Sequence, residues 1–163
     1  MEASDVVRLL RLLEHEGIDV VVDGGWGVDS LLGHQTRPHT DLDIAIEHKD
    51  VSKLRKLLAE RGYRETPQPN SSDFNFVLEN ALGQKIDVHS YTFNADGKNV
   101  CGIPYPAGSL GGTGSIERYP VRCISAEWVV KFHTRYEPKE KDFKDVQALC
   151  AKFGIAVPRM YLR

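Results

Sequence analysis

The chain has 163 residues, with 21 Lys and Arg against 23 Asp and Glu and a formal net charge of −2. This length suits one domain with its own hydrophobic core, and the nearly balanced charge argues against a long nucleic-acid-binding surface. No apolar stretch is long enough to span a bilayer, and the N-terminus lacks a basic and then apolar targeting pattern. We therefore expect a cytoplasmic protein that binds neither membrane nor nucleic acid.

The first elements alternate between helix and strand. Apolar spacing predicts a helix over about residues 3–16, and the β-branched run after it predicts a strand over 18–22. A Gly24-Gly25 turn then opens a short helix at 26–32. The polar segment that follows leads into a strand that begins with Asp-Leu-Asp.

A second helix and a hairpin are expected in the middle of the chain. Asp50 caps the helix and Gly62 closes it. Residues 74–78 and 84–89 alternate between apolar and polar side chains, which predicts two strands joined by a turn. Asp87 therefore lies on a hairpin strand.

The last part of the chain begins with a segment rich in Gly, Pro and Ser, from residue 91 to 119. It predicts either a long ordered loop or short hairpins beside a functional site. Residues 119–124 predict a last strand. Ser125 then caps a helix, and another helix is expected over about 138–152.

This order of elements predicts an α+β fold. We expect a small mixed sheet with helices packed on one side of it and two further helices at the C-terminus. Residues 1–163 are predicted to form a single domain, with 125–163 as a C-terminal helical extension.

Three aspartates indicate the chemistry. In a strand, alternate side chains share a face, so Asp41 and Asp43 project together. Two adjacent carboxylates repel each other unless a cation lies between them, and Mg²⁺ takes a few carboxylates and fills its other positions with water and phosphate oxygens. Asp87, from a neighbouring strand, either completes this metal site or accepts a proton from an attacking hydroxyl. The set predicts nucleotidyl transfer with two Mg²⁺ ions and a nucleoside triphosphate as co-substrate, with Asp87 as catalytic base.

Four further residues are candidates for contacts with the triphosphate. Gly24 and Gly25 let the backbone approach phosphates closely and donate N–H groups near a helix N-terminus. Arg37 can fork onto phosphate oxygens, and His39 can orient a carboxylate. The alternative for Arg37 and His39 is an ordinary surface loop.

A second set of cations lies on the helix expected after Ser125. Residues three or four apart share a helix face, so Lys131 and Arg135 form a candidate phosphate-binding pair. His133 is turned aside in this arrangement unless the helix ends early. A solvated helix face is the alternative.

Four residues are candidates for the acceptor site. Trp26 and Tyr91 can stack against an apolar part of the acceptor, and His89 follows the third aspartate closely. Asp29 lies about one helical turn after Trp26, so it either faces the acceptor pocket or is solvated.

The chain resembles the small lincosamide nucleotidyltransferases and, more distantly, the aminoglycoside 2″-adenylyltransferases. The resemblance spans about residues 22–149 and rests on four segments: Gly24-Gly25-Trp26-Gly27-Val28-Asp29, Thr36-Arg37-Pro38-His39-Thr40-Asp41-Leu42-Asp43, Ile86-Asp87-Val88-His89 and Phe132-His133-Thr134-Arg135-Tyr136. Many members of the wider superfamily have Gly-Ser where this chain has Gly24-Gly25, so backbone amides must replace a serine hydroxyl here.

The resemblance implies a polymerase-β-like fold and Mg²⁺-dependent adenylylation of a hydroxyl on an antibiotic, which confers resistance. It implies that Asp41 and Asp43 hold metal, that Asp87 is the third carboxylate, and that Gly24, Gly25 and Arg37 lie by the triphosphate. A lincosamide is the first choice of acceptor.

Several alternatives stay open. An aminoglycoside is a polycation and would need an acidic cleft, and another small-molecule hydroxyl is a third choice. A non-catalytic nucleotide-binding regulatory or antitoxin-like module is a different class of answer, against which the joint presence of the three carboxylates argues. Pairing of the chain into a homodimer is also open.

Overall fold

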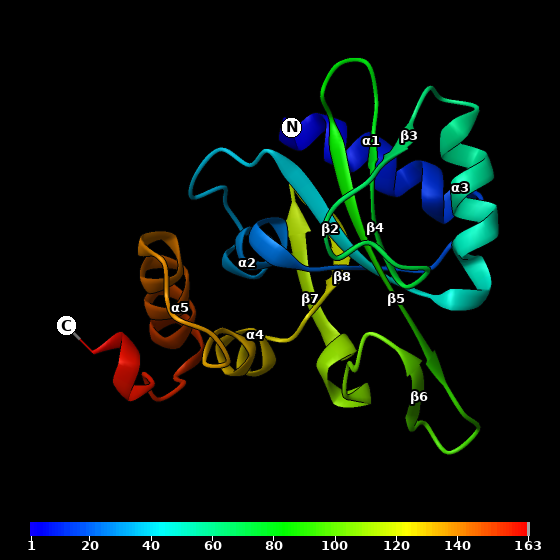
Figure 1. The fold of residues 1–163 in the computed structure, drawn as a ribbon. Helices are drawn as coiled ribbons and strands as arrows, with labels where there is room; N and C mark the ends of the chain where they lie inside the picture. Colours follow the sequence, from blue (N-terminus) through cyan, green and yellow to red (C-terminus); the bar gives the residue numbers. More distant parts are fainter. Residues whose placement is uncertain (163) are drawn as a thin grey trace.

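The computed structural model describes residues 1–162. One eight-stranded sheet forms its centre, with the strands in the order β3-β4-β5-β2-β1-β8-β7 and with β6 paired to β5 (Figure 1). The strands are β1 (Val20–Val22), β2 (Asp41–Glu47), β3 (Arg64–Thr66), β4 (Asn75–Glu79), β5 (Lys85–Phe93), β6 (Asn99–Gly102), β7 (Gly112–Ile116) and β8 (Tyr119–Cys123). The helices are α1 (Ala3–His15), α2 (Gly24–Leu32), α3 (Val51–Ala59), α4 (Ala126–His133) and α5 (Glu140–Phe153), with short 3₁₀ turns at 48–50, 107–111 and 159–161.

The sheet is mixed, as predicted. Strand β2 runs parallel to β5, and β1 runs parallel to β8. The pairs β1–β2, β3–β4, β4–β5, β5–β6 and β7–β8 are antiparallel. Because β2 and β5 are central and parallel, side chains at matching positions of these two strands lie next to each other.

The alternation along β2 divides this strand between the core and the site. Leu42, Ile44 and Ile46 are completely buried, whereas Asp41 and Asp43 face the opposite way and are partly exposed. Burying each large aliphatic side chain contributes about 1.5–3 kcal/mol. The core packing of β2 therefore fixes the direction in which its carboxylates point.

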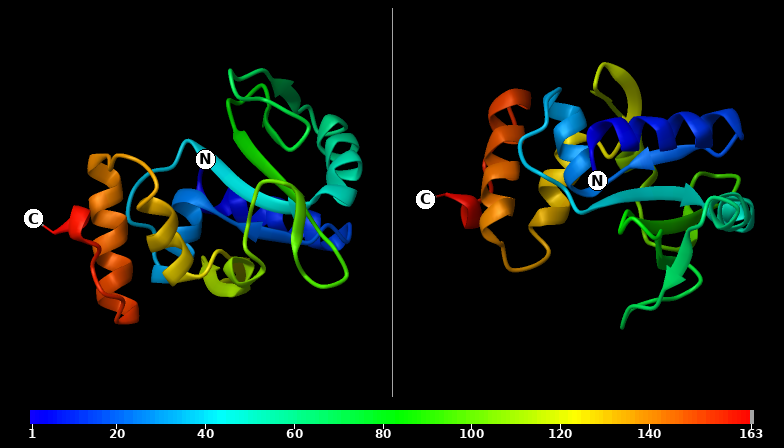
Figure 2. Two further views of the ribbon diagram at one scale, coloured as in Figure 1. Left: turned by 60° about the horizontal axis from the view of Figure 1, so that its bottom comes forward. Right: turned by 90° about the horizontal axis from the view of Figure 1, so that it is seen from above.

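The two C-terminal helices pack beside α2 rather than over the middle of the sheet. Figure 2 shows α4 and α5 together at one end of the molecule, next to α2. Lys152 of α5 donates a hydrogen bond to the Leu32 carbonyl at the end of α2 over 2.7 Å, and the Tyr161 hydroxyl donates to the His133 carbonyl at the end of α4 over 2.8 Å. Within residues 1–162, no helix is long and apolar enough to cross a membrane.

Most predicted elements are confirmed, and the segment from 91 to 119 resolves in favour of short hairpins. Strand β5 continues to Phe93 and pairs with β6, and β7 pairs with β8. The β7–β8 turn places Glu117 and Arg118 at φ values of 46° and 66°. Non-glycine residues rarely adopt this left-handed region, so the sequence lacked the usual glycine signal for this turn. The short edge strand β3 was not predicted.

Candidate active site

Asp43 and Asp87 are direct neighbours across the central parallel strand pair. Asp43 of β2 lies opposite Asp87 of β5 in the register of the sheet, and Asp41 projects from the same face two residues earlier. Burial and the nearby carboxylates of Asp23 and Asp41 raise the pKa of Asp43 to about 8. Carboxylates crowded in this way are stabilised in their charged form by a cation.

Asp87 carries an acceptor atom that lacks a partner. Burial raises the pKa of its carboxyl group, and the His89 ring acts in the opposite direction, with His89 Nε2 3.4 Å from Asp87 Oδ1. That oxygen is buried and accepts no hydrogen bond from any described residue. Because an unsatisfied buried acceptor costs free energy, this atom is suited to a metal ion or to a donated proton.

The aspartates do not enclose a complete metal cage. No group of three His, Cys, Asp or Glu side chains in the described part of the chain is arranged to hold a metal ion by itself. Mg²⁺ usually takes only one or two carboxylates and keeps water and substrate phosphates as its other ligands. The residues present therefore fit a metal that binds together with a nucleotide.

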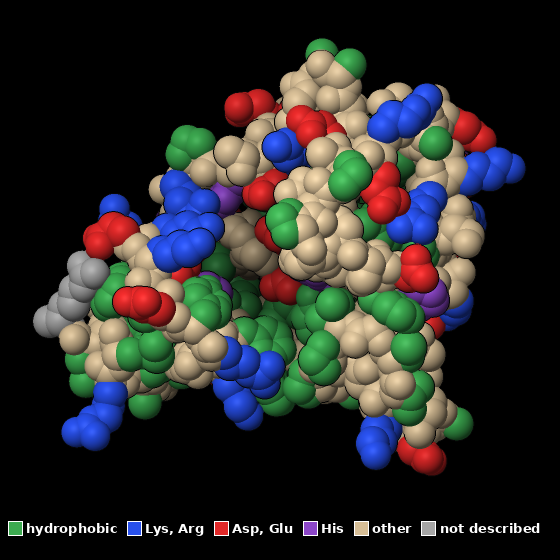
Figure 3. Space-filling view, in the orientation of Figure 1, with side chains coloured by type: hydrophobic (Ala, Val, Ile, Leu, Met, Phe, Trp, Pro, Cys, Tyr) green, Lys and Arg blue, Asp and Glu red, His purple; other side chains and the backbone are tan. Residues whose placement is uncertain are grey.

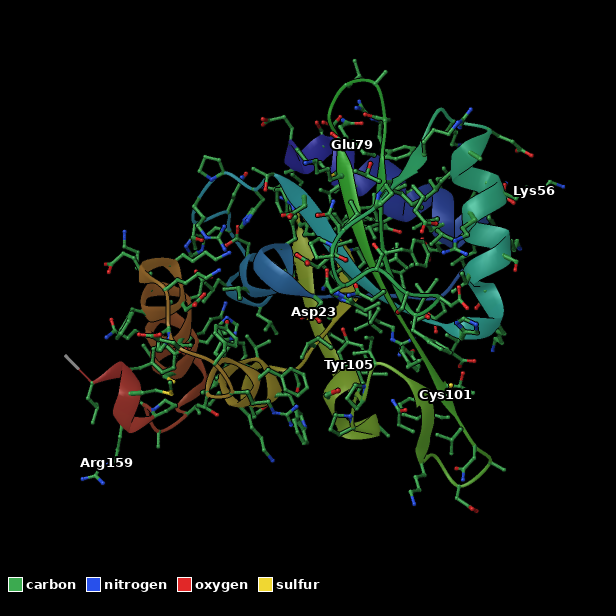
Figure 4. All side chains as sticks on the ribbon, viewed as in Figure 1. Asp23, Lys56, Glu79, Cys101, Tyr105 and Arg159 are labelled. Atoms are coloured by element: carbon green, nitrogen blue, oxygen red, sulfur yellow. The ribbon has the colours of Figure 1, made fainter. Side chains whose placement is uncertain are left out.

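A fourth carboxylate, Asp23, was missed in the sequence analysis. It precedes α2, and its Oδ1 accepts a hydrogen bond from the Gly24 amide over 2.8 Å. Its Oδ2 accepts one from the Tyr105 hydroxyl, also over 2.8 Å, and Figure 4 labels both residues near the centre of the molecule. Burial and Asp23 raise the pKa of Tyr105, so the hydroxyl keeps its proton and orients Asp23. Asp is common at a helix N-cap, so the position of Asp23 before α2 does not by itself mark it as a site residue.

The two glycines are required by close contacts. Gly24 has a φ of +57°, and a Cβ atom built on it would lie 2.0 Å from Oδ2 of Asp43. A Cβ on Gly25 would lie 2.4 Å from Nδ1 of His39 and 2.9 Å from a terminal nitrogen of Arg37. Only glycine fits at either position, so the first turn of α2 packs directly against the carboxylates and the segment 37–39.

A cavity of about 440 Å³ opens in front of this turn. It is lined by Gly24, Gly25, Arg37, His39, Asp41, Asp43, His133, Tyr136, Lys139, Lys141, Asp142 and Asp145. The charge of Lys141 lowers the pKa of Asp43, in keeping with its place in this lining. Figure 3 shows a hollow in the middle of this face, with acidic and histidine side chains inside it and Lys and Arg side chains on the side of the C-terminal helices.

The structure does not place Lys131 and Arg135 on one helix face. Helix α4 ends at His133, so Arg135 is not on the same helix face as Lys131. Lys131 Nζ lies 4.3 Å from the centre of the Trp128 ring, and the Arg135 guanidinium lies 5.0 Å from that of Phe132. Neither lines the cavity. His133 does, together with Lys139 and Lys141 from the start of α5.

Three of the four residues predicted to contact the acceptor are buried, and none of the three lines the cavity of about 440 Å³. Trp26 is 1% exposed and Asp29 is 3% exposed, and both line a separate cavity of about 280 Å³ that contains none of Asp41, Asp43 and Asp87. Tyr91 is buried against Phe93 and Tyr105. Apolar packing thus uses both aromatic rings that the sequence suggested for stacking. His89 is partly exposed and remains beside the third aspartate.

A second cavity of about 250 Å³ lies on the other side of the carboxylates. It shares Asp41 and Asp87 with the site and is otherwise lined by Gln68, Asn70, Ser71, Asn75, Phe76, Val77 and Lys85. A third cavity, of about 310 Å³, lies between α1 and the β1–β8 pair and contains none of the site aspartates. The aspartates therefore stand between a cavity with several cations and one with mainly amide and hydroxyl groups.

This fold, with paired aspartates on a central strand and a Gly-Gly turn at a helix N-terminus, defines a nucleotidyltransferase. The family model described as aminoglycoside-2″-adenylyltransferase matches residues 5–149. The chain belongs to this family of antibiotic nucleotidyltransferases.

Named relatives fall into two branches. A lincosamide resistance protein of Staphylococcus haemolyticus is 30% identical over 152 residues, which cover 90% of this chain and 92% of that protein. A 2″-aminoglycoside nucleotidyltransferase of Klebsiella pneumoniae is 24% identical over 124 residues, covering 76% of this chain and 67% of that protein. The crystal structure of the lincosamide antibiotic adenylyltransferase LnuA bound to lincomycin matches with a TM-score of 0.79 at 26% identity and covers 96% of this chain and 99% of that one.

Proposed function

We propose that this protein transfers a nucleoside monophosphate, with ATP as the first choice of donor, to a sugar hydroxyl of a lincosamide and releases pyrophosphate. The observation that carries this proposal is the in-register pair Asp43–Asp87, which lies between an amide-lined cavity and a larger one in which Arg37, Lys139 and Lys141 accompany Asp142 and Asp145. In this proposal the triphosphate and the acceptor bind on opposite sides of the same carboxylates. In-line displacement needs this geometry, because the attacking hydroxyl and the leaving pyrophosphate occupy opposite sides of the reacting phosphorus.

The triphosphate occupies the larger cavity in this proposal. Gly24 and Gly25 present backbone to it at the start of α2, where the partial positive charge of the helix favours an anion. Arg37 offers a planar set of donors that matches phosphate oxygens. Lys139 and Lys141 add charge from the opposite wall. These cations lie on the side where negative charge accumulates as pyrophosphate leaves.

Asp41, Asp43 and Asp87 would hold Mg²⁺. When bound there, the ion neutralises phosphate charge and polarises the reacting oxygens. Asp43 takes part in its ionised form. Displacing its proton is made easier by a cation, since the raised pKa of Asp43 comes in part from uncompensated neighbouring carboxylates.

Asp87 accepts the proton of the attacking hydroxyl. Its unpartnered buried oxygen and its raised pKa both increase its affinity for a proton. A general base contributes about 10²–10⁴-fold to the rate. The adjacent His89 limits how far the pKa of Asp87 rises, so the carboxylate stays available as a base.

The smaller cavity favours a sugar over a polycation as acceptor. Apart from the shared site aspartates, the charged residue among those that line it is Lys85, and the polar ones are Gln68, Asn70, Ser71 and Asn75. Amide and hydroxyl side chains pair well with sugar hydroxyls, whereas an aminoglycoside needs additional carboxylates to balance its charge. We therefore place a lincosamide above an aminoglycoside, in agreement with the higher identity to the lincosamide resistance protein.

The test is pyrophosphate release with Mg²⁺ and each of ATP, GTP, CTP and UTP against a panel of lincosamides and aminoglycosides. Release that depends on a lincosamide supports the proposal. Release that depends only on aminoglycosides moves the acceptor to the other branch. Failure of every acceptor, with intact nucleotide binding, would overturn the assignment of an antibiotic substrate.

A further inference from the structure

Four side chains form a continuous hydrogen-bonded series beneath the Gly24-Gly25 turn. The series begins on α2 and ends on α5, in the order Asp29, His39, Arg37 and Asp145. We propose that Asp29, His39 and Asp145 are positioning residues that hold the Arg37 guanidinium toward the triphosphate, which makes α5 a part of the nucleotide site. This inference rests on the proposed function for its ligand. It gives Asp29 a role different from the acceptor contact expected from the sequence.

The geometry of the inner half is tightly defined. Oδ2 of Asp29 lies 2.5 Å from Nε2 of His39, and both side chains are 3% exposed. The other carboxylate oxygen of Asp29 accepts a hydrogen bond from the Thr36 hydroxyl over 2.6 Å. The His39 ring also packs against Trp26, with 4.6 Å between ring centres. Both Asp29 and His39 are therefore fixed by packing and by hydrogen bonds.

The outer half ends on the C-terminal helix. A terminal nitrogen of Arg37 lies 2.9 Å from Nδ1 of His39, and the other terminal nitrogen donates to Oδ2 of Asp145 over 3.1 Å. The Asp145 side chain is 7% exposed and the Arg37 side chain is 29% exposed. Both terminal nitrogens of the Arg37 guanidinium are thus held by protein groups, and Arg37 also lines the cavity.

The direction of these hydrogen bonds follows from the chemistry of Arg. A guanidinium only donates, so His39 Nδ1 must accept. The single ring proton of His39 is then on Nε2 and is donated to Asp29. This fixes the tautomer of His39 through its partner on the far side, in the same way that outer partners orient metal-binding histidines.

Arg37 keeps donors for a ligand. It has five N–H groups, of which the contacts to His39 and Asp145 use two. Its Nε is buried and has no hydrogen-bond partner among residues 1–162. A Cβ on Gly25 would lie 2.9 Å from this guanidinium, so the turn expected to bind phosphate lies directly over it. A hydrogen-bonded series that served only the stability of the fold would not need an open cavity beside Arg37.

The first experiment compares two replacements of His39 by nucleotide affinity. His39→Phe keeps a ring against Trp26 but loses both hydrogen bonds, whereas His39→Gln offers an amide oxygen to Arg37 and an amide N–H to Asp29. We expect His39→Phe to raise the Kd for Mg²⁺–ATP and the KM for ATP by about tenfold or more, with the KM for the acceptor nearly unchanged. His39→Gln should restore most of this loss.

His48→Phe is a matched control. His48 is partly buried and packs against Phe74. Its Nδ1 shares one hydrogen bond with the Ser90 hydroxyl over 2.9 Å. It lies outside both cavities that meet at the site. We expect no change in nucleotide affinity from His48→Phe, so a general effect of removing a histidine is separated from the positioning effect.

The second experiment removes the residue through which the others act. In the background of Arg37→Ala, His39→Phe and Asp145→Ala should each change the Kd for Mg²⁺–ATP by less than about twofold, because their effects pass through Arg37. Equal losses with and without Arg37 would overturn the inference. So would a His39→Phe protein that is folded and binds ATP as tightly as the wild type.

The two proposals fail in different ways. A wild-type protein that binds ATP but transfers nothing to any acceptor would contradict the proposed function, while the affinity measurements would still decide the role of Asp29, His39 and Asp145. If the wild type transfers the nucleotide normally and the substituted proteins bind Mg²⁺–ATP as tightly as the wild type, only the inference is contradicted.

Discussion

The acidic and basic halves of the site are built in different ways. The acidic half comes from two adjacent strands whose core-facing residues fix the direction of Asp41, Asp43 and Asp87. The basic half combines the segment before β2 with the start of α5, more than a hundred residues away in the chain. Strand periodicity therefore predicts the acidic half from local sequence, whereas the basic half depends on where α4 ends and how α5 packs.

The largest effect is expected on the acidic side. Asp87→Asn keeps the shape of the side chain but removes the base, so kcat should fall by about 10²–10⁴-fold. The Kd for Mg²⁺–ATP, measured by equilibrium titration, should change much less than kcat. Near-normal turnover in this variant would exclude Asp87 as the base. His89→Gln is the neighbouring control, for which we expect a smaller loss.

A substitution at the junction of the two halves should come next. Gly24→Ala places a methyl group 2.0 Å from Oδ2 of Asp43 and requires an alanine at a φ of +57°. The left-handed conformation alone costs about 1–2 kcal/mol, and displacing a reacting group by about 1 Å can cost 10²-fold in rate. We expect a lower Tm and a loss of kcat of this order.

Gly83→Ala separates the two contributions to that result. Gly83 also has a positive φ, of +74°, but a Cβ there would meet nothing within 4 Å. It should lower Tm and leave kcat unchanged. Equal activity losses at the two positions would show that the contact with Asp43 is not the cause.

A matched pair of lysines tests the corrected basic half. Lys141 lines the cavity and acts on Asp43, whereas Lys131 lies over the Trp128 ring. Lys141→Ala should raise the KM for ATP several-fold, in line with the loss of one partly exposed charge interaction of about 1 kcal/mol. Lys131→Ala should leave it unchanged. A larger rise in the KM for ATP from Lys131→Ala than from Lys141→Ala would instead support Lys131 as the phosphate contact that the sequence predicted.

The last prediction concerns the stability of the metal-free protein. Burial and nearby carboxylates raise the pKa of Asp43 from 3.8 to about 8, so between these values the folded protein binds more protons than the unfolded chain. Its contribution to stability therefore decreases as pH rises through this range. Tm measured without divalent cations should show this decline between about pH 4 and pH 8, the range set by the two pKa values.

Added Mg²⁺ completes that measurement. Because a cation stabilises the ionised carboxylates, Mg²⁺ should raise Tm more at the upper end of the pH range than at the lower end. Asp43→Asn should remove most of this difference. A stabilisation by Mg²⁺ that is independent of pH and of Asp43 would place the ion elsewhere.

The sequence predicted those parts of the molecule that local patterns determine. Asp-Leu-Asp in a strand and the Gly-Gly turn led directly to β2 and α2. The same reasoning failed for Arg135, because the end of α4 at His133 was not visible in the pattern of residues. It also did not reveal that Trp26 packs against His39 and that Asp29 pairs with it. Asp23 was overlooked because its contact with Tyr105 joins residues 82 positions apart.

Mass analysis of a lincosamide after incubation with Mg²⁺, ATP and either the wild type or Asp87→Asn tests the paired aspartates and the substrate together. The wild type should add one adenylyl group to the antibiotic, and Asp87→Asn should yield almost no product in the same time. Equal product from both proteins would contradict the role given to the paired aspartates, and an unmodified lincosamide with the wild type would contradict the proposed substrate.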